Sequence, residues 1–158
     1  MPDAPNCTSL QKTLFRRYLL MLAPAALIFG GWAACRQAGL TPNMPSGTAA
    51  VIGPIVFIAA IILAVALPLL CRVGFVRKVE GQKNVESAPF LDFQLTLMSI
   101  ALTAPFAAAA GYIAGVANFH FAGAFLASLY AAYYYYPSEK RIHQEMRLFR
   151  VTSNTKTA

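Results

Sequence analysis

Charged residues are scarce in this chain, and acidic ones are scarcer than basic ones. Asp, Glu, Lys and Arg make up 12% of its 158 residues, with 6 acidic and 13 basic side chains, whereas about a quarter of a soluble domain is charged. None of these charges lies in the middle third of four long apolar stretches, which cover residues 18–34, 49–71, 90–114 and 119–136. The usual marks of ion transport or proton relay inside a membrane are therefore missing.

Residues that carry chemistry are also few. Cys7, Cys35 and Cys71 are isolated from one another in sequence. His120 lies at the start of the fourth stretch and His143 in the tail beyond its other end, which excludes a haem held by two histidines inside one bundle. The sequence contains neither a nucleophile beside its base nor a glycine-rich phosphate loop. We expect no catalytic site, no metal and no cofactor.

The four apolar stretches have the length of membrane-spanning helices. A hydrocarbon core about 30 Å thick takes about 20 helical residues, and 58% of the chain is hydrophobic. Only residues 115–118 separate the last two stretches, so that pair must be antiparallel. The predicted fold is all-α, with a four-helix antiparallel transmembrane bundle at 15–136. A disordered start at 1–14 precedes it, and a basic tail with a short amphipathic helix follows at 137–158.

The distribution of lysine and arginine predicts the orientation. Twelve of the 13 lie before the first stretch, between the second and third, or after the fourth, and only Arg36 lies elsewhere. Because basic loops stay in the cytoplasm, we expect a multi-pass protein of the cell inner membrane with both termini cytoplasmic. The first stretch also has the basic start and small residues of a cleaved secretory signal. Trp32, where a lipoprotein cleavage box has an aliphatic residue, favours a retained helix.

Small residues recur at helical spacing in every stretch, as in Ala23, Ala26, Gly30 and Ala34 of the first. They let helix backbones approach closely, which in lipid replaces the hydrophobic effect as the cause of association. The candidate helix-packing glycines are Gly30, Gly53, Gly111 and Gly115. The last two form a GxxxG pair, which serves packing within the bundle or dimerisation.

One polar face occurs on the third stretch, at Asp92, Thr96, Ser99 and Thr103. The spacing i, i+4, i+7, i+11 places them on one side of a helix. These residues could line a hydrated half-channel in which Asp92 is the entry group for a cation or proton. Alternatively, Asp92 is a carboxylate in the first turn of the helix, where the helix dipole favours it, and the hydroxyls bond to their own helix. Pro105, further along, predicts either a simple kink or a gate.

Aromatic and basic residues gather at the predicted cytoplasmic boundary. Tyr133 to Tyr136 surround the end of the fourth stretch, as an interfacial belt or as a site for a quinone or lipid headgroup. The candidate contacts to anionic lipid or to a partner are Arg77, Lys78, Lys83, Lys140, Arg141, Arg147 and Arg150. Because these charges flank the spans, the expected partners are the anionic inner leaflet and another membrane protein or a second copy, and not nucleic acid.

The tail beyond Pro137 predicts a short amphipathic helix. Ser138 can cap it, and Ile142, Met146 and Phe149 would share one face. We expect that face to lie on the inner leaflet or to dock on a partner.

These observations favour a non-enzymatic accessory, assembly or scaffold subunit of a membrane complex. One alternative is a small-solute or ion channel or carrier that uses the polar face. Another rests on Gln82, Asn84, Glu86 and Pro89 in the loop that begins at Arg77. This loop resembles the first cytoplasmic loop of the MAPEG family of glutathione-dependent membrane enzymes, which are basic four-span proteins of this size. Here the acidic residue lies one place closer to the asparagine and the loop follows the second span. The resemblance implies glutathione binding through Arg77 and Asn84.

Overall fold

The chain folds into helices that follow its apolar stretches. The computed structural model describes residues 7–40, 46–82 and 84–151. Its helices are α1 (Cys7–Gln37), α2 (Ser46–Ile61), the π-helical turn η1 (Ile62–Ala66), α3 (Leu67–Val79), α4 (Ser87–Ala101), α5 (Ala104–Ile113), α6 (Asn118–Tyr134) and α7 (Glu139–Leu148). In these ranges the only β pairing is an isolated bridge between Val85 and Val151. The all-helical class is confirmed.

Prolines interrupt two of the long helices. Pro105 has no N–H to donate to the carbonyl of Ala101, and the helix breaks there between α4 and α5. Thr103, inside the break, donates its hydroxyl to the carbonyl of Ile100 at 2.6 Å. Before Pro68, one turn widens into η1, a common change where the regular hydrogen-bond ladder is interrupted.

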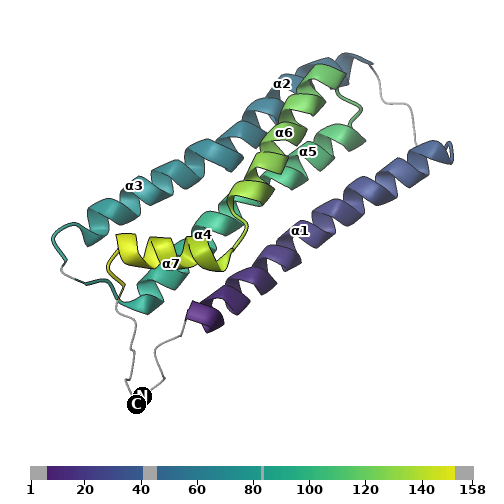
Figure 1. Cartoon of the computed structure of the whole chain (residues 1–158). Coiled ribbons are helices and arrows are strands. Elements are labelled where there is room, and N and C mark those ends of the chain that lie inside the picture. The colour runs from purple at the N-terminus through teal and green to yellow at the C-terminus, as the bar shows by residue number, and fades with distance from the viewer. Residues whose placement is uncertain (1–6, 41–45, 83, 152–158) are drawn as a thin grey trace.

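The long helices lie side by side (Figure 1). α2 packs on α5 and α6, α5 packs on α6, α1 packs on α4 and α5, and α3 packs on α4. After α6 the chain turns back, and α7 lies across α4 and contacts α1 (Figure 1).

Three helical segments are long and apolar enough to cross a membrane, namely Ser9–Gln37, Ala49–Val79 and Ser87–Ile113. They indicate a membrane protein. α6 has 17 residues and is therefore about 25 Å long, a little less than a typical hydrocarbon core of about 30 Å. Four crossings in an antiparallel bundle stay a prediction.

Glycines allow the closest approach of α2 to α5 and α6. A Cβ on Gly53 would lie 2.8 Å from Nδ1 of His120, and a Cβ on Gly111 would lie 2.8 Å from Cγ1 of Val56. A Cβ on Gly123, which the sequence analysis did not single out, would overlap the ring of Phe57. We call these contacts the glycine seam. A larger residue in the seam would force the facing side chain of His120, Val56 or Phe57 to shift.

The other two glycines singled out for packing have different surroundings. Apart from its chain neighbours and the backbone of its own helix, no atom of the described residues lies within 4 Å of a Cβ built on Gly30. Gly115 has a φ of +61° and ends α5, where the N–H of Val116 donates to the carbonyl of Gly111 at 3.2 Å. Gly115 therefore serves a helix C-terminus that needs the left-handed conformation.

The largest core lies at the end of the molecule that contains α7. Ile142 and Met146 are buried in it, and Phe149 packs against it. The ring of Phe149 lies 5.3 Å from that of Phe75 and 6.0 Å from that of Phe93, while those two rings stack at 4.1 Å. The apolar face expected to meet lipid or a partner is therefore covered by this chain. The physical reason is that α6 is shorter than α1. Beyond the end of α6, α7 packs on α1 and contacts α4.

The glycine seam predicts a sharp contrast between two identical substitutions. Val56 is β-branched and has little rotamer freedom in a helix, so Gly111→Ala should lower the free energy of unfolding by about 1–3 kcal/mol through overpacking. Gly30→Ala meets open space and should raise it by roughly 0.5–1 kcal/mol through helix propensity. Thermal unfolding of both purified variants in the same detergent measures the difference. Equal stability of the two variants would show that the seam is not tight.

Candidate functional site

Several of the polar side-chain contacts of the fold lie at the junction between α6 and α7. α6 ends at Tyr134, and Ser138 stands in extended conformation before α7. The Ser138 side chain accepts a hydrogen bond from the N–H of Arg141 at 3.4 Å, which satisfies one free donor of the helix N-terminus. The predicted cap is therefore present. From α1, the hydroxyl of Tyr18 donates to the carbonyl of Ala132 at 2.9 Å and fixes the end of α6.

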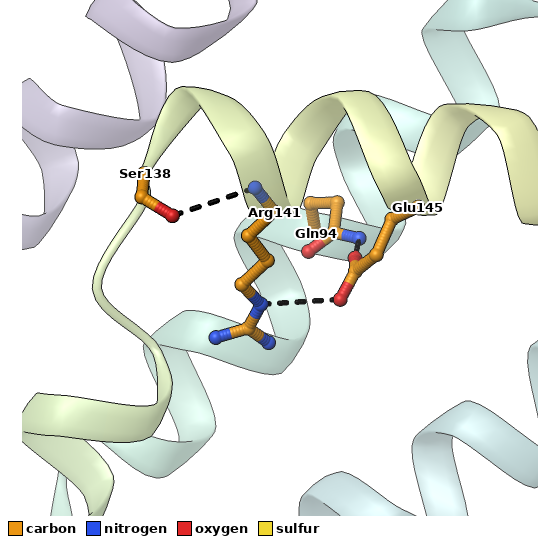
Figure 2. Close-up of polar contacts among 4 residues, drawn as sticks. All are labelled: Gln94, Ser138, Arg141 and Glu145. Atoms are coloured by element: carbon orange, nitrogen blue, oxygen red, sulfur yellow. Dashed lines mark hydrogen bonds and ion pairs between the residues drawn. The ribbon is translucent and has the colours of Figure 1, made fainter.

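A buried carboxylate joins α7 to α4. Glu145 is 8% exposed, and its Oε1 accepts from Nε of Arg141 at 3.2 Å. Its other oxygen, Oε2, accepts from the side-chain amide of Gln94. Figure 2 shows these side chains converging between the two helices. Both oxygens of the carboxylate are thus engaged, as a buried charge requires.

Tyrosine rings hold the same arginine from the other side. The guanidinium carbon of Arg141 lies 4.7 Å from the ring centre of Tyr134 and 5.3 Å from that of Tyr135. Such cation–π contacts are stabilising when the arginine is partly desolvated, and the Arg141 side chain is 23% exposed. The ion pair and the two rings together leave this side chain little freedom.

A cavity of about 490 Å³ opens beside this arginine. Its lining includes Arg72, Ser138, Arg141, Gln144 and the rings of three tyrosines. We call it the junction cavity. Guanidinium, hydroxyl and amide donors beside aromatic walls suit an anion attached to an apolar body.

The residues of the polar face of α4 and its continuation lie in different surroundings. Thr96 and Ser99 line a second cavity, of about 580 Å³, with Arg16 and Arg17 of α1. Asp92 is exposed and is not part of that lining. The hydroxyl of Thr103 bonds to its own helix.

No family model, curated protein or solved structure matches the chain. The site must therefore be judged on its own geometry. Within residues 7–40, 46–82 and 84–151, no three His, Cys, Asp or Glu side chains lie together in a way that could hold a metal ion.

The basic residues proposed as contacts lie in two settings. The exposed ones are Arg77, Lys78, Lys140, Arg147 and Arg150. Arg141 alone of the described set is built into a network, and Lys83 lies outside the described residues. Lys140, His143 and Arg147 line a further cavity of about 550 Å³, which shares Gln144 and Leu148 with the junction cavity. Arg77, Asn84 and Glu86, which carry the resemblance to glutathione enzymes, are all exposed.

Sequence reasoning missed Gln94 and Glu145. It also did not single out Arg72 as a residue that lines a cavity together with Arg141. Arg141 and Glu145 are four residues apart on a helix, a spacing that favours an ion pair, so this contact was detectable. The contact of Gln94 with Glu145 joins residues 51 positions apart, and no local pattern indicates it.

The carboxylate network predicts how firmly α7 is held. Glu145→Ala leaves the side chains of Arg141 and Gln94 without their acceptor, at a cost of about 1–3 kcal/mol. Amide hydrogen exchange in α7 should then become about tenfold faster or more. The matched control is Glu139→Ala, which removes an exposed carboxylate from the first turn of the same helix. Equal exchange in both variants would contradict a structural role for Glu145.

Proposed function

We propose that this chain is an integral membrane protein with four spans, formed by α1, by α2 with α3, by α4 with α5, and by α6. Three of the spans have suitable length and composition. α6 is supported by its outward apolar surface, since Phe119 is 74%, Leu126 64% and Leu129 50% exposed. A helix slightly shorter than the hydrocarbon core is accommodated by local thinning and by anchoring residues at its ends. The concentration of Lys and Arg in the loops on one side supports a cytoplasmic location for both termini.

We infer further that the protein acts without chemistry of its own, as an accessory, assembly or scaffold subunit beside another membrane protein. The observation that carries this proposal is the surface of α1. Its small residues Ala23, Ala26, Gly30 and Ala34 are all exposed. In the most apolar part of this helix, only 11% of the residues are buried within the fold, whereas 56% are buried in the corresponding part of Ser87–Ile113. α1 therefore offers a helix-packing surface that its own bundle does not use.

Such a surface fits a transmembrane helix of a partner. Small side chains permit close backbone contact, which is a main source of helix association in lipid. Lipid alone could cover the large residues of α1, such as Leu27, which is 75% exposed. The line of small residues suits close contact with a neighbouring helix, because short side chains let two backbones approach.

The alternatives have weaker support. A cation channel along α4 would pass Thr96 and Ser99, yet Arg16 and Arg17 line the same cavity and would repel a cation. The glutathione-enzyme alternative would use Arg77 and Asn84, which are exposed.

Photo-cross-linking tests the partner proposal. A photoreactive residue at position 30 in the native membrane should give a discrete adduct with another membrane protein. Gly30→Leu should reduce recovery of that protein several-fold in mild detergent, without lowering the thermal stability of the chain. The matched control is Gly74, also a helical glycine with nothing described within 4 Å of its Cβ. Gly74→Leu should leave recovery unchanged.

The adducts also separate the other outcomes. An adduct between two copies of this chain would make the partner a second copy. Adducts with lipid alone would contradict the accessory role.

Cysteine labelling tests the fourth span. In a cysteine-free background, Asn118→Cys and Glu139→Cys lie at exposed positions on either side of α6. We expect a membrane-impermeant maleimide to label Asn118→Cys in intact cells and Glu139→Cys only after the membrane is opened. Labelling of both from the same side would exclude a crossing by α6.

A further inference from the structure

We propose that the junction cavity binds a phosphate group carried by an amphiphile, with the phosphate between the guanidinium groups of Arg72 and Arg141. Both arginines line this cavity, one from α3 and one from α7. The position of the cavity relative to the bilayer rests on the proposed membrane topology. The expectation that it binds an anion rests on the two arginines that line it.

Arg141 is held in place but keeps most of its donors. Its Nε is bonded to Glu145, and its planar group lies against Tyr134 and Tyr135. In the described part of the chain, no acceptor bonds to its two terminal nitrogens, and Figure 2 shows that Nε, not either of these two atoms, is joined to the carboxylate. A guanidinium that is fixed at one edge and open at the other is suited to bidentate binding of a phosphate.

The charge of the cavity is not neutralised by its own residues. Arg72 is half-buried, and within the described ranges it has no ion-pair partner, since the single ion pair there joins Arg141 to Glu145. Glu145 is the one carboxylate of the lining, and both of its oxygens already accept hydrogen bonds. Two arginines against one saturated carboxylate leave an excess positive charge in a partly enclosed space, which favours an anion.

The walls explain why the anion should carry an apolar body. Tyr133, Tyr134, Tyr136 and Leu148 contribute rings and methyl groups to the lining. Of these, Tyr133 is 87% and Leu148 64% exposed, so the apolar wall is open at its rim. A purely mineral anion would leave this wall in contact with water.

The cavity also lies where an anionic amphiphile is available. On α3, Leu69 and Leu70 are 59% and 65% exposed, and only Cys71 separates them from Arg72. On α6, the tyrosines end the apolar helix just before Ser138. In the proposed topology this change from apolar to charged surface marks the headgroup layer of the inner leaflet. The phosphate could belong to a phospholipid or to a soluble phosphorylated compound with an apolar part.

The second arginine-lined cavity shows why the first is favoured. Arg16 and Arg17 are exposed, and no aromatic ring or carboxylate of the described residues is shown holding them. Flexible exposed arginines attract anionic lipid in general, whereas Arg141 is already in a binding geometry.

The test is native mass spectrometry of the full chain after delipidation in detergent. Phosphatidic acid, phosphatidylglycerol or phosphatidylcholine is then added in turn. We expect the two anionic lipids to bind to the unaltered chain, and Arg72→Gln and Arg141→Gln each to weaken this binding about tenfold. The comparison variants are Arg77→Gln and Arg147→Gln, which remove exposed charges from the same two helices and should weaken binding far less than tenfold, because an exposed arginine contributes only a general attraction to anionic lipid.

Arg72→Gln keeps the proposal separate from folding defects. Arg141→Gln removes the ion pair with Glu145 and can loosen α7, so thermal unfolding is measured for every variant. Arg72 makes no hydrogen bond or ion pair with any described residue, and its loss should change lipid binding without changing stability. Equal weakening in the Arg77 and Arg147 variants, or equal binding of phosphatidylcholine, would overturn the proposal.

A second experiment, with a soluble phosphate compound as competitor, identifies the source of the phosphate. Displacement of bound lipid by millimolar phenyl phosphate, with the same dependence on Arg72, would assign the cavity to a soluble phosphorylated compound. Resistance to displacement would assign it to phospholipid. Because the assay is done in detergent, failure of cysteine labelling at positions 118 and 139 would reject the topology alone. Failure of the Arg72 and Arg141 variants to weaken binding would reject the cavity alone.

Discussion

The structure depends most on the docking of α7 at the end where α6 stops short. α1 has 31 residues and α6 has 17, so a bundle of these helices alone would leave part of α4 and α1 uncovered. The aromatic cluster of Phe75, Phe93 and Phe149 and the buried Met146 fill that region. The direction in which α7 runs back from Pro137 then decides where Arg141 and the junction cavity lie.

A buried carboxylate makes this docking specific. Apolar contacts alone would let α7 slide or rotate on α4, because hydrophobic packing has little directionality. Glu145 must keep both oxygens bonded once it is buried, and only one placement of α7 brings it to Gln94 while Arg141 reaches it from the same helix. The same constraint holds Arg141 through its Nε, at the edge of the cavity that it lines.

The two ends of the molecule are held together by different means. At the end with α7, long side chains interlock in a core. At the other, α2, α5 and α6 meet through glycine and alanine, with Gly53, Gly111 and Gly123 against larger neighbours. α1 takes part in the first core through Leu10 and Leu14. Toward the far end of α1, a Cβ on Gly30 would contact no other helix among the described residues. This asymmetry leaves a face of small residues on α1 exposed.

The helical class, the apolar segments, the break near Pro105 and the cap at Ser138 followed from the sequence alone. Each is a local property, set by hydrophobic run length, by the missing N–H of proline or by a side chain three residues from its donor. Local pattern could not show that Ala23, Ala26, Gly30 and Ala34 are exposed while Gly53 and Ala60 of α2 are buried, since both sets of small residues recur at helical spacing. Nor could it join Gln94 to Glu145, or Arg72 to Arg141. Those pairings depend on which helix faces are brought together across long sequence separations, and only the tertiary structure decides that.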